Sequence, residues 1–75
     1  MLDPRVETFL AVCQTMNFTK AAEALHITQP AVSQHIHVLE EQYGTKLFHY
    51  ENRQLSLTES GRLFLRTAAT MHHDA

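Results

Sequence analysis

Apolar residues recur at helical spacing between residues 28 and 43. Val32, Ile36, Leu39 and Tyr43 are separated by steps of four, three and four positions, which places them in one stripe on a helix. The preceding Thr28 is suited to cap the start of this helix. We therefore predict a helix that turns one apolar face to a core and ends where Gly44 can adopt the left-handed conformation.

The opposite face of this helix is polar. At about 100° per residue, the side chains that point away from the stripe in its first half are Pro30, Ser33, Gln34 and His37. The acidic residues Glu40 and Glu41 fall in the second half of the helix. The first half of the polar face is therefore expected to tolerate a polyanion, and the second half is not.

Two helices are predicted before residue 28. Asp3-Pro4 is typical of a helix start, and the apolar face that follows consists of Val6, Phe9, Leu10, Cys13 and Met16. We expect Cys13 to be a packing residue, since no neighbouring charge in the sequence would activate its thiol; a reactive thiol is the alternative. Thr19 is the expected cap of a short, alanine-rich helix ending near residue 25. The turn at residues 26–28 then completes a helix-turn-helix.

The periodicity becomes alternating after Gly44. Phe48 and Tyr50 alternate with polar neighbours, and so do Leu55 and Leu57, which predicts a two-stranded hairpin with a polar turn at residues 52–53. Such a hairpin is unstable alone, so it should pack on the helices through its apolar residues as a wing. The predicted fold is mainly α: a winged helix-turn-helix with a three-helix core, a two-stranded wing and a C-terminal linker helix.

The final helix is expected to begin at Thr58-Glu59, and it carries apolar residues on more than one face. A domain this small cannot bury all of them, so we expect contact with a second subunit through Phe64, Leu65, Ala68 and Met71. A terminal amphipathic helix that frays is the alternative. We divide the chain into a winged domain, residues 1–58, and a linker and dimerisation helix, residues 59–75. The chain is expected to be the N-terminal piece of a longer protein.

Composition limits the function only loosely. The chain has 75 residues and one cysteine, so it forms a single domain without an internal disulfide and suits a reducing compartment. It shows neither a membrane-spanning run nor a signal peptide, which favours the cytoplasm. The net charge of −2 argues against indiscriminate attraction to nucleic acid but not against a local basic surface. Six histidines can gain positive charge beside an anion.

The run FTKAAEALHITQPAVSQHIHVLEEQYGTKLF at residues 18–48, with LSLTESG at residues 55–61, resembles the N-terminal winged helix-turn-helix domain of LysR-type transcriptional regulators. The resemblance implies a homodimer that binds double-stranded promoter DNA and pairs through its last helix. It also implies a C-terminal domain, absent from this sequence, that binds a small-molecule inducer. The chain departs from the family pattern at Gln34, where arginine is common, and at His49-Tyr50, where Glu-Arg is common. Both departures remove cations, so affinity or operator preference should differ.

The first half of the polar helix face carries the predicted base contacts. The amides of Gln29 and Gln34 suit the edge of adenine, Ser33 can reach a base or a phosphate, and Pro30 can touch a thymine methyl. The resemblance places these four residues in the major groove. His37, one turn further on, could reach a phosphate or a guanine. Simple solvation on a helix surface is the alternative for Gln34 and His37.

Three residues outside this helix are also candidates for DNA contacts. Thr19 and Lys20 at a helix start would favour a phosphate, although a capped helix with a solvated lysine is the alternative. Arg53 at the wing tip could enter a narrow minor groove, or it is a solvated turn residue. Arg62 and Arg66 could flank the DNA backbone or pair with acids, and the sequence leaves this open.

Enzyme and metal functions have little support in the sequence. His35 and His37 point in different directions on a helix, and Ser33 has no acid partner or glycine elbow. We therefore expect no enzyme activity, cofactor or metal. The predicted function is sequence-specific binding of double-stranded DNA in transcription regulation. The alternative from another class is a winged-helix module that binds a protein, which the acidic balance would suit; a metal-binding histidine protein is a third idea.

Overall fold

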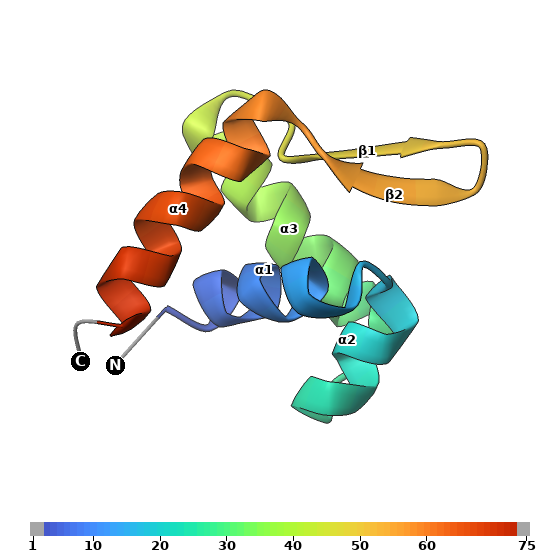
Figure 1. The fold of residues 1–75 in the computed structure, drawn as a ribbon. Coiled ribbons are helices and arrows are strands. Elements are labelled where there is room, and N and C mark those ends of the chain that lie inside the picture. Colours follow the sequence, from blue (N-terminus) through green and yellow to red (C-terminus); the bar gives the residue numbers. More distant parts are fainter. Residues whose placement is uncertain (1–2, 74–75) are drawn as a thin grey trace.

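The computed structural model describes the backbone of residues 3–73 and the side chains of residues 3–70. Within that range the chain forms helices, a hairpin and a last helix in the order α1 (Pro4–Thr15), α2 (Phe18–Leu25), α3 (Gln29–Tyr43), β1 (Phe48–Glu51), β2 (Gln54–Leu57) and α4 (Glu59–His73). The hairpin projects from the helical body on the side opposite α4 (Figure 1). This is the predicted winged helix-turn-helix.

Each helix begins at a polar side chain that accepts a hydrogen bond from the first turn. Asp3 Oδ1 accepts from the Arg5 amide at 2.8 Å, and Thr28 Oγ1 accepts from the Ala31 amide at 3.2 Å. Thr58 Oγ1 accepts from the Gly61 amide at 2.8 Å. These three predicted caps are confirmed, and each supplies a partner for an amide that the helix itself leaves unpaired.

The predicted cap of the second helix is wrong. Asn17, not Thr19, caps α2, and its Oδ1 accepts from the Lys20 amide at 2.8 Å. Asn17 lies in extended backbone at φ −158°, as an N-cap requires. Thr19 instead belongs to the first turn of α2, which begins at Phe18.

Aromatic rings join the helices and the wing in one core. The ring of Phe9 on α1 lies 5.4 Å from that of Phe48 on the wing and 4.8 Å from that of Phe64 on α4. Around Phe9, the fully or nearly fully buried side chains are Val12, Ala21, Ala22, Val32, Ile36, Leu39 and Leu47. One side chain of α1 therefore packs against both the wing and α4.

The apolar stripe of α3 is confirmed for three of its members. Val32, Ile36 and Leu39 are buried, but Tyr43 is 56% exposed. Tyr43 is the last residue of α3, beyond the centre of the core, and its ring lies 5.0 Å from that of Phe64. More than two turns earlier on α3, His35 Nδ1 is 2.7 Å from Thr8 Oγ1 on α1. The Thr8 hydroxyl also donates to the Pro4 carbonyl at 3.0 Å, so the Thr8 side chain connects α3 to the first turn of α1.

The predicted hairpin with its turn at residues 52–53 is confirmed, and its strands pair with Phe48 opposite Leu57 and Tyr50 opposite Leu55. Asn52 and Arg53 both have positive φ, 51° and 61°, as in the two-residue turns whose twist matches antiparallel strands. Leu47 and Phe48 are buried, and Leu55 and Leu57 pack partly against the core. The predicted packing of the wing is therefore confirmed.

A small network at the base of the wing fixes its position. Thr58 Oγ1 donates to the Lys46 carbonyl at 2.6 Å, and the Thr58 amide donates to the Leu47 carbonyl at 3.1 Å. On the other side, the Leu47 amide donates to Glu40 Oε2 at 2.9 Å. The wing is thus attached to both α3 and α4 by hydrogen bonds at its first residues.

Candidate nucleic-acid interface

The first half of α3 presents an uncovered polar face. Its outward side chains are all exposed, and they are Gln29, Pro30, Ser33, Gln34 and His37. The opposite side of the same helix is buried in the core. An exposed helix face with side chains that can donate and accept hydrogen bonds, backed by a packed core, is suited to entering a major groove.

The wing and the helix-turn-helix enclose a hollow beside this face. The hollow has a volume of about 380 Å³. It is lined by Met16, Asn17, Phe18, Thr19, Gln29, Tyr50, Arg53 and Leu55. Thr19 from α2, Gln29 from α3 and Arg53 from the wing, which are far apart in sequence, are therefore brought to one side of the molecule.

A second hollow lies between α3 and the first wing strand. Its volume is about 630 Å³, and the polar side chains that line it are Ser33, His37, Glu40, Lys46, His49, Tyr50 and Glu51. Ser33 and His37 thus face the wing. Lys20, Pro30 and Gln34 line neither hollow, but all three are exposed.

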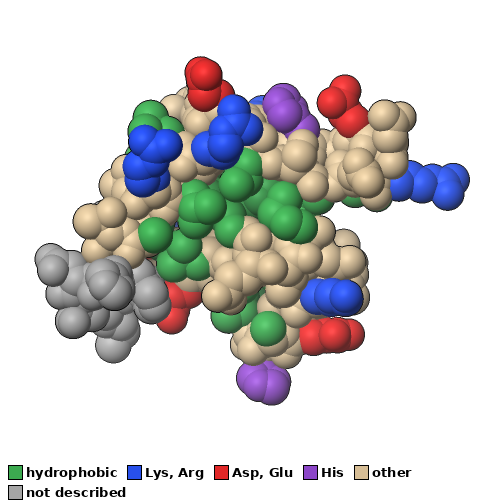
Figure 2. All heavy atoms as spheres, in the orientation of Figure 1, with side chains coloured by type: hydrophobic (Ala, Val, Ile, Leu, Met, Phe, Trp, Pro, Cys, Tyr) green, Lys and Arg blue, Asp and Glu red, His purple; other side chains and the backbone are tan. Residues whose placement is uncertain are grey.

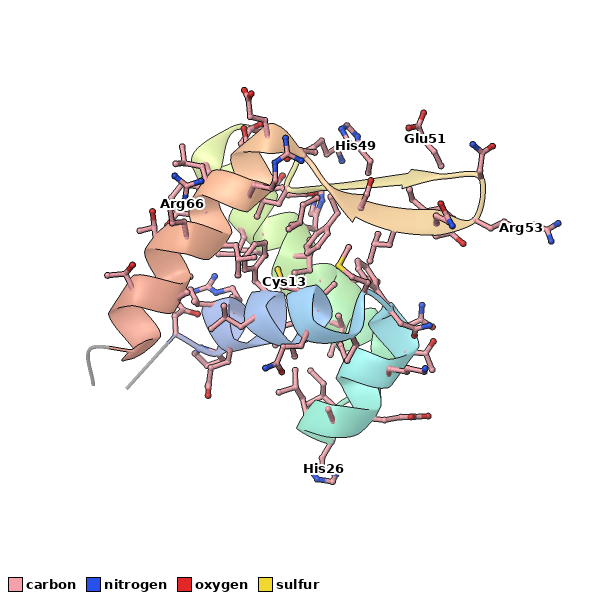
Figure 3. The ribbon with its side chains drawn as sticks, viewed as in Figure 1. Cys13, His26, His49, Glu51, Arg53 and Arg66 are labelled. Carbon is pink, nitrogen blue, oxygen red and sulfur yellow. The ribbon has the colours of Figure 1, made fainter. Side chains whose placement is uncertain are left out.

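Each of the two hollows is lined by a single Lys or Arg side chain, Arg53 in the first and Lys46 in the second. Arg53 extends into solvent from the wing tip, well away from Arg66 on α4 (Figure 3). Figure 2 shows Lys and Arg side chains scattered over the visible face rather than gathered in one patch, with an isolated one at the wing tip. The geometry therefore favours a few defined phosphate or groove contacts over diffuse attraction.

Of the two acidic residues predicted on the outer face of α3, Glu40 departs from the expectation and Glu41 does not. Glu40 was placed on the outer face, but its side chain is only 12% exposed and it accepts the hydrogen bond from the Leu47 amide. Lys46 Nζ lies 3.7 Å from its other oxygen. Glu41 Oε2 lies 3.6 Å from His37 Nε2. A protonated His37 therefore has a local acidic partner that competes with any phosphate.

The two arginines whose role the sequence leaves open, Arg62 and Arg66, both belong to α4. Arg62 Nη1 donates to the Leu57 carbonyl at 3.3 Å, so Arg62 stabilises the junction between the wing and α4. Arg66 lines a separate groove between α1 and α4 together with Leu10, Cys13 and Leu65. Neither arginine lines the hollows beside α3.

Cys13 is a packing residue, as predicted. Its side chain packs against the buried core from α1, and burial raises the pKa of its thiol to about 11. The thiolate, which is the reactive form, is therefore scarce at neutral pH.

The predicted dimer residues have different environments. The ring of Phe64 meets that of Phe9 edge-to-face and lies tilted against that of Tyr43, and Leu65 is partly buried. Ala68 is only 2% exposed within the single chain, so it belongs to the chain's own core, which argues against its predicted contact with a second subunit. The side chain of Met71 lies outside the described residues. Leu63, which was not assigned to the interface, is 63% exposed.

A helix-turn-helix with a free recognition face, flanked on the same side by an arginine-tipped hairpin, defines a winged helix-turn-helix of the DNA-binding class. Residues 5–62 match the family described as bacterial regulatory helix-turn-helix protein, lysR family. The chain therefore belongs to the LysR family of bacterial regulatory helix-turn-helix proteins.

Curated relatives and solved structures agree with this assignment. CatR of Pseudomonas putida, an HTH-type transcriptional regulator, is 49% identical over 63 residues, or 84% of this chain and 22% of CatR. The regulator YxjO of Bacillus subtilis (strain 168) is 46% identical over 68 residues, 91% of this chain and 23% of its own length. The chain thus spans under a quarter of these two relatives.

Among solved structures, a LysR-family transcriptional regulator from Eggerthella lenta DSM 2243 is 64% identical, with a TM-score of 0.84 over 93% of this chain and 99% of the solved one. The DNA-binding domain of BenM in complex with benA site 1 DNA is 34% identical, with a TM-score of 0.90 over 99% of this chain and 83% of that one. Separately, none of the helices in residues 3–73 is both long and apolar enough to cross a membrane.

Proposed function

We propose that this domain binds double-stranded promoter DNA in a sequence-specific manner and so regulates transcription. The single observation that carries the proposal is the juxtaposition of Thr19, Gln29 and Arg53 around one hollow, beside the uncovered polar face of α3. A helix and a hairpin placed in this way can occupy a major groove and the adjacent minor groove together.

Each predicted contact residue has a defined part in this proposal. Gln29, Pro30, Ser33 and Gln34 read base edges from the first half of α3. Thr19 and Lys20 bind a phosphate at the start of α2, and Arg53 enters the minor groove. His37 contacts a phosphate in competition with Glu41, whose Oε2 lies 3.6 Å from His37 Nε2 in the free protein.

We further propose a homodimer that pairs through α4, with one winged helix-turn-helix on each half-site. The exposed apolar side chain of Leu63 and the partly buried Leu65 support this proposal. A dimer doubles the number of phosphate and base contacts, which an acidic domain with few cations needs for specific affinity. Control by a small-molecule inducer would act through a C-terminal domain, and the site of action would be the cytoplasm.

The test is selection of bound duplexes from a random DNA pool, followed by fluorescence anisotropy with the selected duplex and a scrambled one. The proposal predicts at least about a thousandfold preference for the selected duplex at physiological salt. It also predicts an affinity that falls as salt rises, since phosphate contacts release counterions. Equal affinity for both duplexes, or no binding, would refute the proposal and favour a protein-binding winged helix.

A further inference from the structure

Tyr50 has an unusual environment on the wing. Successive side chains of a strand point to opposite faces, and Figure 3 shows His49 and Glu51 projecting from the same face of β1, away from α1 and α2. Tyr50 therefore shares the helix-facing side with Phe48. Phe48 is 8% exposed, whereas Tyr50 is 71% exposed. An aromatic ring on the inner side of the hairpin is thus left uncovered.

The two hollows of the interface meet at this ring. Phe18, Tyr50 and Leu55 line both of them. Phe18 and Leu55 are partly buried and pack against the core, so they form the floor, and Tyr50 is the exposed side chain of the three. It stands between the hollow that contains Gln29 and Arg53 and the hollow that contains Ser33 and Lys46.

We propose that Tyr50 lies over the phosphodiester strand that separates the two grooves, with its ring on a deoxyribose and its hydroxyl donating to a phosphate oxygen. This inference rests on the proposed function, in which α3 occupies a major groove and the wing occupies the next minor groove. Two adjacent grooves of a duplex share one phosphodiester strand as their common wall. A side chain between α3 and the wing tip must then face that strand.

The chemistry of the phenol suits this position. Its hydroxyl is a donor that has no protein partner among the described residues, and a tyrosine ring buries apolar surface while its tip stays polar. A tyrosine side chain, unlike that of arginine or lysine, brings no positive charge to a phosphate. Its contact with a phosphate therefore displaces no counterion, unlike a contact from arginine. It also carries no sequence information, because every nucleotide has the same phosphate and sugar.

The test compares Tyr50→Phe and Tyr50→Ala with Tyr43→Phe as the matched control. The chain contains two tyrosines, and Tyr43 is also exposed but contacts Phe64 on α4. We expect Tyr50→Phe to weaken binding about tenfold per half-site, as for a lost hydrogen bond to a charged group, and Tyr50→Ala to weaken it further. The loss should be equal on selected and scrambled duplexes, with an unchanged slope of log K against log salt.

The control should bind like the wild-type protein. Because Tyr50 is exposed, its variants should also unfold at the wild-type temperature, which separates lost contact from lost structure. If the wild-type protein binds the selected duplex and both Tyr50 variants bind equally well, the inference about Tyr50 is wrong while the proposed function stands. If the wild-type protein shows no preference for any duplex, the proposed function itself fails and the inference falls with it.

A second measurement reports the contact without relying on affinity. In protein labelled with 3-fluorotyrosine, the two ¹⁹F resonances are assigned with the Tyr43→Phe variant. The Tyr50 resonance should move on addition of the selected duplex, and the Tyr43 resonance should not. A stationary Tyr50 resonance in the bound protein would overturn the inference.

Discussion

Gly61 offers a direct test of how the wing is positioned, through the substitution Gly61→Ala. Gly61 lies in the first turn of α4 and is buried against the base of the wing. A Cβ at this position would lie 2.9 Å from Leu57 Cδ2 and 3.0 Å from the Leu47 carbonyl carbon, and closer still to the Leu47 carbonyl oxygen. That oxygen already accepts a hydrogen bond from the Thr58 amide. The methyl group can therefore be accommodated only if α4 and the wing move apart.

The loss of stability in Gly61→Ala depends on which atoms must move to admit the new methyl group. Overpacking a tight core by a methyl group costs about 1–3 kcal/mol, and we expect about 3 kcal/mol because backbone rather than a flexible side chain obstructs the Cβ. In a domain of this size each kcal/mol lowers Tm by about 4–8 °C, so the expected loss is about 12–24 °C. At a temperature where the variant is still folded, its displaced wing should also weaken DNA binding.

Gly44→Ala is the matched control. A Cβ at Gly44 would meet nothing within 4 Å, so Gly44→Ala creates no steric clash. Its backbone has φ +65°, and placing alanine in this left-handed conformation costs about 1 kcal/mol relative to glycine. Thermal unfolding followed by circular dichroism compares the two variants. If Gly61→Ala melts at or above the temperature of Gly44→Ala, the close approach of α4 to Leu47 does not hold the wing in place.

Three further predictions concern single side chains. Arg53→Ala should weaken binding to all duplexes and reduce the slope of log K against log salt by about one per subunit. Arg66→Ala, the control on α4, should change neither the affinity nor the slope. If both variants lose affinity equally, the proposed role of the wing is contradicted. Gln34→Ala should cost about 1–3 kcal/mol of binding free energy on the selected operator and should remove the preference for one base at a single position. If Gln34→Ala instead weakens binding equally on every single-base variant of the operator, Gln34 does not read a base. Cys13 should react slowly with iodoacetamide at pH 8 in the folded protein and rapidly in urea. Burial raises the pKa of the Cys13 thiol from 9.0 to about 11. The stabilisation that depends on the protonated thiol is therefore complete below pH 9 and is lost as pH rises towards 11. The free energy of unfolding in urea should fall over this pH range in the wild-type protein, and Cys13→Ala should lack this part of the fall.

Local signals predicted most of the secondary structure. The caps at Asp3, Thr28 and Thr58 and the turn at residues 52–53 depend on short-range hydrogen bonds and backbone preferences, which the sequence shows directly. The cap of α2 was misassigned because Asn17 and Thr19 are both good caps two residues apart. The choice between them depends on how α2 packs, with the ring of Phe18 6.2 Å from that of Phe48.

The periodicity of α3 predicts its outward side chains, and the family resemblance assigns Gln29, Pro30, Ser33 and Gln34 to the groove. Periodicity identifies a helix face but not the depth of burial. Tyr43 and Tyr50 both occupy apolar positions of a correct pattern, yet each is more than half exposed. Glu40 was misjudged because its partner, the Leu47 amide, belongs to the loop after the helix. The hollow that joins Thr19, Gln29 and Arg53 is formed by three elements, so no local pattern could reveal it.

The most direct test of the central claim is a ¹⁵N-HSQC titration of the domain with the duplex selected from the random pool. If α3 and the wing occupy adjacent grooves, amide shifts will cluster at residues 17–20, 28–37 and 50–53, while the buried α1 amides around Phe9 and Val12 stay in place. If the largest shifts instead fall on α1 and α4, and residues 28–37 are unaffected, the assignment of this face to DNA is contradicted.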